Sequence, residues 1–331
     1  MTLDIDTLAA RVRDGDRRAL ARAITLVESG REDHRREANA LLERLADPDR
    51  QALRIGLSGT PGVGKSTFIE AFGLKLIDAG KRVAVLAVDP SSARTGGSIL
   101  GDKTRMEQLS RAPGAFIRPS PSQSHLGGVA RRTRDAIALC EAAGFDIVLI
   151  ETVGVGQSET IVAEMSDLFV LLLAPAGGDE LQGVKRGIME IADLILINKA
   201  DGALKDTAIR TAADYAGALR LMRAREGDAP GFPKAMIVSA VEETGLDAAW
   251  DAMTELAEYR RNSGFWDRRR ADQARGWFVD EVRKGLLRRL QADPQAEAAM
   301  EALAYEVAEG RRAPGAAAAE VLDVLTRDER A

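Results

Sequence analysis

The sequence predicts an α/β fold, a doubly wound and mostly parallel sheet with helical N-terminal and C-terminal extensions. Between residues 51 and 245, short apolar runs alternate with stretches of helical character. The runs are apolar almost throughout, which is typical of parallel strands that helices cover on both faces. We expect strands at Arg54–Ser58, Val83–Val88, Ile147–Ile150, Leu168–Leu173, Leu194–Ile197 and Ala235–Val238.

Apolar residues at helical spacing flank this central region on both sides. Before residue 51 they form three stripes, which predict three helices: Ile5, Leu8 and Val12; Leu20, Ile24 and Val27; Leu41, Leu42 and Leu45. Helical spacing returns after residue 245. We therefore predict a helical extension over 1–50, a central domain over 51–245 and a C-terminal helical arm over 246–331.

The C-terminal arm carries an apolar stripe that the central sheet does not require. The stripe consists of Trp277, Val282, Leu286 and Leu290. An apolar stripe has to be buried, and a two-fold interface between helices of two copies is an economical way to bury it. We therefore expect a homodimer.

Composition and charge exclude several classes of partner. Of 331 residues, 45% are hydrophobic and 29% charged, with a net charge of −5. The acidic balance argues against nucleic acid, which requires a concentrated basic face. One cysteine, Cys140, and two histidines give no basis for a disulfide or a dedicated transition-metal site. The chain starts without the features of a signal peptide and has no run of about 18 apolar residues. We therefore expect a cytoplasmic protein without a membrane partner.

The strongest motif is a complete phosphate-binding loop between the first predicted strand and a helix that starts near Thr67. It reads Gly59-Thr60-Pro61-Gly62-Val63-Gly64-Lys65-Ser66. Its glycines allow backbone N–H groups to curl around a β-phosphate, and the helix N-terminus adds partial positive charge. We expect Lys65 to reach the β- and γ-phosphates and the Ser66 hydroxyl to bind Mg²⁺. The loop predicts a fold of the P-loop NTPase type.

A second motif predicts that the base is guanine. Asn198-Lys199-Ala200-Asp201 follows an apolar strand, and an Asp at a strand end can accept both N1–H and N2–H₂ of guanine. Adenine cannot supply this pair of donors, and a buried carboxylate without them is costly. Ser239-Ala240, after the last predicted strand, is placed to give a backbone contact to guanine O6.

Two further strand ends place carboxylates near the expected γ-phosphate. Asp89 follows the second predicted strand, and Glu151 follows the third. Carboxylates at the carboxyl ends of parallel strands are well placed to hold Mg²⁺ or its water shell, and we expect Glu151 to act through a water. Gly154 would bring its own N–H toward the γ-phosphate. Either carboxylate could instead belong to a turn or helix cap.

The group that orients the attacking water is less obvious. Many small GTPases carry Gln directly after the glycine that Gly154 represents, but Val155 stands there and Gln157 comes two residues later. Asp102, in a glycine-rich segment able to close over the phosphates, is the better candidate for this role and an additional candidate Mg²⁺ ligand. The alternative is that Asp102 only caps the helix that follows it.

Two more segments contain paired glycines. The segment Gly177–Lys185 follows the fourth predicted strand and could be a nucleotide-sensitive loop or only a connection. Gln123-Ser124-His125-Leu126-Gly127-Gly128 is similar to the cobalamin motif Asp-x-His-x-x-Gly, but Gln replaces the Asp that would orient the histidine. We therefore expect a polar loop there, with no cobalamin bound through a His ligand.

Taken in order, these motifs resemble the MeaB/ArgK group of G-protein chaperones, which includes the methylmalonic aciduria type A protein. The motifs that carry the resemblance are Gly59–Ser66, Val88–Ser92, Gly101–Lys103, Glu151–Gln157 and Asn198–Asp201. The resemblance covers nearly the whole chain.

This resemblance implies a GTPase partner of adenosylcobalamin-dependent methylmalonyl-CoA mutase or a related acyl-CoA mutase. It would gate cofactor loading and protect the mutase, with Mg²⁺ and GTP or GDP as ligands. It also implies a homodimer through the C-terminal helices. By the same reasoning Asp102 would be the catalytic acid residue, Asp89 and Glu151 would serve Mg²⁺, and Asp179, Gln182 and Lys185 would couple the mutase to the nucleotide.

Two alternatives remain at this point. A P-loop kinase would need an acceptor pocket with a general base and would usually take ATP, whereas Asn198–Asp201 favours guanine. A GTPase for metal-cofactor insertion would need Cys or His ligands, and one Cys with two separated His does not supply them.

Overall fold

A computed structural model describes residues 4–88, 106–119, 126–152, 158–175 and 186–327 of the chain. The chain divides into two compact units, the first ending at Arg270 and the second beginning at Ala271. None of the described helices is both long and apolar enough to cross a membrane.

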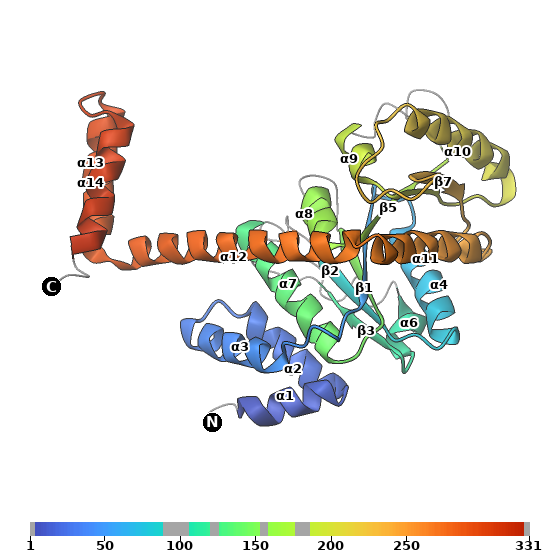
Figure 1. Ribbon diagram of the computed structural model, residues 1–331, viewed down its shortest axis with the longest axis horizontal. Helices are drawn as coiled ribbons and strands as arrows, with labels where there is room; N and C mark the ends of the chain where they lie inside the picture. Colours follow the sequence, from blue (N-terminus) through green and yellow to red (C-terminus); the bar gives the residue numbers. More distant parts are fainter. Residues whose placement is uncertain (1–3, 89–105, 120–125, 153–157, 176–185, 328–331) are drawn as a thin grey trace. The chain divides into compact units, whose positions relative to one another are not determined.

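The described part of the first unit is built on a seven-stranded sheet in which every strand pairs in parallel with its neighbours. The spatial order is β3-β2-β4-β1-β5-β6-β7, so β1 is the central strand. Figure 1 labels β1, β2, β3, β5 and β7 of this sheet. The strands are β1 (Leu53–Gly59), β2 (Val83–Val88), β3 (Ala115–Arg118), β4 (Ile147–Thr152), β5 (Leu168–Leu173), β6 (Leu194–Ile197) and β7 (Lys234–Ile237). This confirms the predicted doubly wound α/β fold.

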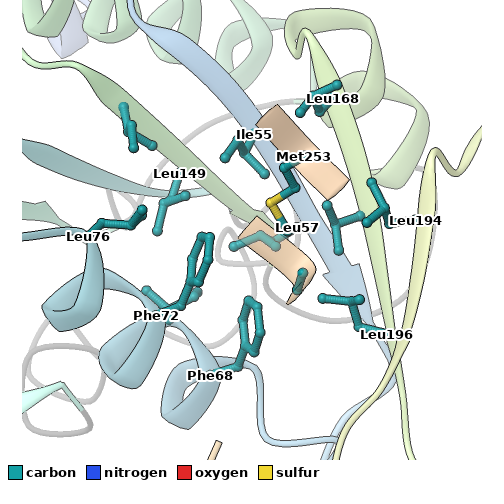
Figure 2. Close-up of a cluster of buried hydrophobic side chains, with 14 of the residues drawn as sticks. Ile55, Leu57, Phe68, Phe72, Leu76, Leu149, Leu168, Leu194, Leu196 and Met253 are labelled. Atoms are coloured by element: carbon teal, nitrogen blue, oxygen red, sulfur yellow. The ribbon is translucent and has the colours of Figure 1, made fainter. Parts of the chain in front are cut away.

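Helices cover both faces of the sheet. On one face, α4 (Lys65–Asp78), α6 (Glu107–Arg111) and α11 (Leu246–Asn262) enclose a hydrophobic core. Figure 2 shows Phe68 and Phe72 of α4 and Met253 of α11 packed against strand residues of this core. On the other face, α7 (Leu126–Ala142) contacts β2, and α8 (Ser158–Met165) contacts β1, β4 and β5. The remaining connections are α9 (Arg186–Ile191), a short 3₁₀ turn at Gly202–Leu204 and α10 (Lys205–Arg220).

The three helices expected before residue 51 are present. They are α1 (Ile5–Arg13), α2 (Arg17–Glu28) and α3 (Glu32–Leu45), and they pack on one another and on α7. Asp4 caps α1 by accepting from the Thr7 N–H, and Asp16 caps α2 by accepting from Arg18 and Ala19 N–H groups.

Helix α11 and the first turns of α12 (Phe265–Ala292) belong to the first unit by their contacts. Leu246, Met253 and Leu256 of α11 lie in the same core as the strands. The α12 side chain Trp266 is buried, donates from Nε1 to Gln51 at 2.9 Å and lies 4.4 Å from the guanidinium of Arg270. The domain boundaries at residues 50 and 245 stay predictions. By its internal contacts, the chain divides into its two compact units after Arg270.

The second unit consists of the rest of α12 with α13 (Pro294–Ala308) and α14 (Pro314–Arg327). Leu303, Ala317 and Val321 form its small core, and Leu290 packs against them. Val282 and Leu286, two other members of the predicted stripe, are 46% and 54% exposed. The stripe therefore divides, with Leu290 serving the unit's own core and Val282 and Leu286 facing outward.

Candidate nucleotide-binding site

The phosphate-binding loop connects β1 to α4, and close packing explains two of its glycines. A Cβ at Gly59 would lie 2.3 Å from the Leu172 carbonyl oxygen of β5, so a larger residue would displace the strand. Gly64 has φ of +90°, in the left-handed region that favours glycine, and a Cβ there would lie 2.8 Å from Nδ2 of Asn198. Helix α4 begins at Lys65, two residues earlier than expected.

Lys65 is held by the phosphate-binding loop itself. Its Nζ donates to the Gly59 carbonyl at 2.6 Å and lies 3.5 Å from that of Thr60. Burial holds the pKa of Lys65 below its usual range, although the negative charges of Glu151 and Glu159 oppose this effect. These carbonyls are weaker partners than phosphate oxygens, so the ammonium is available to an incoming anion.

Asn198 connects the guanine motif to the phosphate-binding loop. Its Nδ2 donates to the Val63 carbonyl at 2.9 Å, and its Oδ1 accepts from the Ala240 N–H at 3.2 Å. Lys199 adds a second contact, from Nζ to the Gly62 carbonyl at 2.7 Å. One amide side chain thus ties together three segments that are far apart in the sequence, at residues 63, 198 and 240.

Asp201 and Ser239 are joined directly. The Ser239 hydroxyl donates to Oδ2 of Asp201 and accepts from the Glu242 N–H at 3.0 Å. Ser239 is buried, whereas Asp201 is half-buried and can face a ligand. The sequence indicated only a backbone contact from Ser239 and Ala240; the orienting hydrogen bond from the Ser239 side chain to Asp201 was missed.

Ser66 and Glu151 are the described candidates for Mg²⁺. Glu151 is buried near the end of β4, where it pairs in register with Leu57 of β1 and Ala87 of β2. Ser66 lies in the first turn of α4. A hydroxyl and a carboxylate are oxygen ligands of the kind that Mg²⁺ prefers, and nucleotide phosphates and waters supply the others. The described residues hold no group of three or more His, Cys, Asp or Glu that could bind a metal ion by itself.

Several predicted site residues lie outside the described residues, and their roles stay predictions. They are Asp89, Asp102, Gly154, Asp179, Gln182 and Lys185, together with His125 of the motif similar to a cobalamin site. For the described loop residues Thr60, Pro61 and Thr67, the structure gives an exposed position on the loop or in the first turn of α4.

Sequence reasoning also missed Glu159, which lies in the first turn of α8 and is almost fully buried. Its charge favours the protonated form of Lys65, so it belongs to the electrostatic surroundings of the phosphate site. Its position two residues after Gln157, at the start of a helix, was the available signal.

Comparison with known proteins shows the family of this chain. The family model described as Methylmalonyl Co-A mutase-associated GTPase MeaB matches residues 20–295. This chain belongs to the MeaB family of GTPases. Like other members, it is a P-loop enzyme that binds guanine nucleotide and hydrolyses GTP.

Relatives in the MeaB family align over most of the chain. The mouse protein named methylmalonic aciduria type A homolog, mitochondrial, is 47% identical over 95% of this chain and 78% of its own. The Escherichia coli protein named GTPase ArgK is 47% identical over 86% of this chain and 85% of its own. The crystal structure of a protein named LAO/AO transport system kinase superposes with a TM-score of 0.76 at 35% identity, covering 98% of this chain and 99% of that one.

Proposed function

We propose that this GTPase is a chaperone of an adenosylcobalamin-dependent acyl-CoA mutase, with methylmalonyl-CoA mutase as the first candidate. It would gate cofactor loading and protect the mutase from inactivation, with GTP hydrolysis timing the exchange. The observation that carries the proposal is the family match over residues 20–295, whose description names the association with this mutase.

The reaction follows from the roles assigned to the site. Lys65 moves from the Gly59 carbonyl to the β- and γ-phosphates, because phosphate is the stronger partner for an ammonium. Mg²⁺, when bound, neutralises charge that develops on the phosphates; Ser66 and Asp89 would hold it, with Glu151 acting through a water. Asp102 would orient the attacking water and could also contact the ion.

Guanine selection supports a GTPase over a kinase that uses ATP. Asp201, oriented by Ser239, presents a carboxylate suited to N1–H and N2–H₂ of guanine. The one observation that favours a kinase is the word kinase in the name of the solved relative. Phosphate release from GTP without any acceptor molecule separates the two functions, because a kinase without its acceptor releases little phosphate.

The assembly that we propose is a homodimer that contacts the mutase. Val282 and Leu286 of the second unit offer exposed apolar surface for a second copy. Asp179, Gln182 and Lys185 would couple the mutase to the nucleotide. A cytoplasmic location and the absence of cobalamin bound through His125 stay predictions.

Complex formation tests the proposal. The chain and a methylmalonyl-CoA mutase are mixed with GDP or with a non-hydrolysable GTP analogue, and the mass of the complex is measured by light scattering. We expect a complex whose affinity differs between the two nucleotides. Lys65→Ala should abolish this difference, because the variant binds nucleotide poorly. Failure to form a complex with either nucleotide contradicts the proposal.

A further inference from the structure

Two buried hydroxyl groups meet at the carboxyl ends of β1 and β4. The Thr152 hydroxyl donates to the Ser58 hydroxyl across 3.1 Å, and the exposed fractions of the two residues are 0% and 1%. No role in the nucleotide site has been assigned to either residue above, yet each is directly adjacent in sequence to a residue of that site. Ser58 precedes Gly59, and Thr152 follows Glu151.

The strand registers place this contact at the point where the pairing of β1 with β4 ends. The last backbone pair between β1 and β4 is Leu57 with Glu151. Beyond it, β4 continues beside β2, where Val88 pairs with Thr152. In the same direction β1 continues beside β5, where Gly59 pairs with Leu172. The Thr152–Ser58 hydrogen bond therefore joins β1 and β4 one residue beyond their last paired residues.

The order of the strands reverses between β1 and β4, because the chain goes from β1 toward one edge of the sheet and from β4 toward the other. The chain leaves β1 through α4 on one face and leaves β4 through α8 on the other. In open α/β sheets the ligand lies in the crevice that such a change opens at the carboxyl ends of the strands. The hydroxyl pair thus lies where such a crevice is expected. It joins the strand that carries the phosphate-binding loop to the strand that carries Glu151.

The contact connects the backbone segments on which Lys65 depends. Gly59, next to Ser58, gives the carbonyl that accepts from Lys65 at 2.6 Å. Glu151, next to Thr152, favours the charged form of the same lysine. A change in the spacing of β1 and β4 would move both partners relative to each other.

We propose that Thr152 and Ser58 are positioning residues for GTP hydrolysis. Their hydrogen bond sets the spacing between the phosphate-binding loop and the end of β4, and so the placement of Glu151 relative to that loop. Because GDP lacks the γ-phosphate, loss of this spacing lowers the rate of hydrolysis more than it lowers GDP affinity. The inference concerns hydrolysis by the chain alone and does not depend on the mutase.

The test compares four variants with the wild type: Thr152→Val, Ser58→Ala, the double variant and Thr152→Ser. Single-turnover GTP hydrolysis gives the rate, and calorimetry gives the Kd for GDP. We expect Thr152→Val and Ser58→Ala each to lower the rate about fivefold, the equivalent of one net hydrogen bond of about 1 kcal/mol. The Kd for GDP should change less than about twofold, and Thr152→Ser, which keeps the hydroxyl, should retain the wild-type rate.

Two comparisons distinguish positioning from a general loss of packing. The double variant should be no slower than either single variant, because both remove the same bond. Thr133→Val is the matched control, since the buried Thr133 hydroxyl bonds within α7, to the Val129 carbonyl at 2.9 Å. The proposal is overturned if the single variants keep the wild-type rate, if their losses multiply in the double variant, if GDP affinity falls as much as the rate, or if Thr133→Val is equally slow.

Discussion

At the scale of single residues, Asn198 and Asp201 have different tasks although they belong to one motif. Both polar ends of the Asn198 amide are used inside the protein, by the Val63 carbonyl and the Ala240 N–H. Asp201 receives one hydrogen bond from Ser239 and keeps acceptor capacity for a base. We therefore assign the architecture of the site to Asn198 and the base preference to Asp201.

The base preference gives the first prediction. In Asp201→Asn, the amide offers a donor where guanine also donates, so affinity for GDP should fall by about 10²-fold or more. Xanthine nucleotides, whose ring edge accepts at that position, should bind better than they bind the wild type. Calorimetry measures both, with the exposed Asp206→Asn as the control. Unchanged GDP affinity in Asp201→Asn would remove Asp201 from the base site.

At the scale of elements, a buried ionic cluster fixes α11 to the sheet. Asp193, just before β6, accepts from Arg260 of α11 at 2.7 and 3.0 Å and from Arg225 at 2.8 Å. It also accepts from the Phe169 N–H at 2.8 Å. Burial alone would raise the pKa of the Asp193 carboxyl, but the two arginines outweigh it and hold the pKa below its usual range.

This cluster predicts how stability depends on pH. Because the folded-state pKa of Asp193 lies below the unfolded value of about 3.9, its stabilising effect is present at neutral pH and is lost as the pH falls below about 4. Asp193→Asn should lower the free energy of unfolding by about 3–5 kcal/mol at pH 7, since it leaves the buried Arg260 and the half-buried Arg225 without their shared carboxylate. Urea unfolding at pH 7 and pH 3 measures both effects. If the variant and the wild type lose the same stability on acidification, Asp193 does not contribute to this pH dependence.

Elements also show what the sequence could predict and what it could not. Five of the six expected strands were recognisable because they are almost entirely buried and therefore nearly all apolar. The sixth, β7 at the edge of the sheet, is half-buried but still contains the apolar run that the sequence shows. Strand β3, Ala115–Arg118, was missed because its fourth residue is charged, which leaves an apolar run of only three residues. In the site, the motif residues were predictable from spacing, whereas the Ser239–Asp201 and Thr152–Ser58 contacts depend on strands meeting in space.

At the scale of the whole molecule, the residues of the predicted dimer stripe differ in burial. Leu290 packs in the core of the second unit, so replacing it would disturb that unit as well as any interface. Val282 and Leu286 are exposed and can be changed without opening a core. An apolar pair of this kind is consistent with an isologous contact between two copies.

The dimer prediction follows from these two positions. We expect the wild type to have the mass of two chains by light scattering at micromolar concentration, and Val282→Glu with Leu286→Glu to have the mass of one. Two buried charges that face their own copies would oppose association. Leu221→Glu, at a residue 90% exposed in the first unit, serves as the control and should stay dimeric. A monomeric wild type would contradict the interface.

The rate of phosphate release shows whether a mutase regulates this GTPase, as we propose. The sequence has Val155 where many GTPases carry a water-orienting Gln, so we expect slow hydrolysis by the chain alone. Partners that complete such sites can raise the rate by up to about 10⁵-fold. We predict that an adenosylcobalamin-dependent acyl-CoA mutase raises the GTP turnover substantially. Lys185→Ala should reduce the ratio of stimulated to basal rate, whereas the exposed Lys81→Ala should not. A mutase that leaves the wild-type rate unchanged would contradict regulation of this GTPase by a mutase.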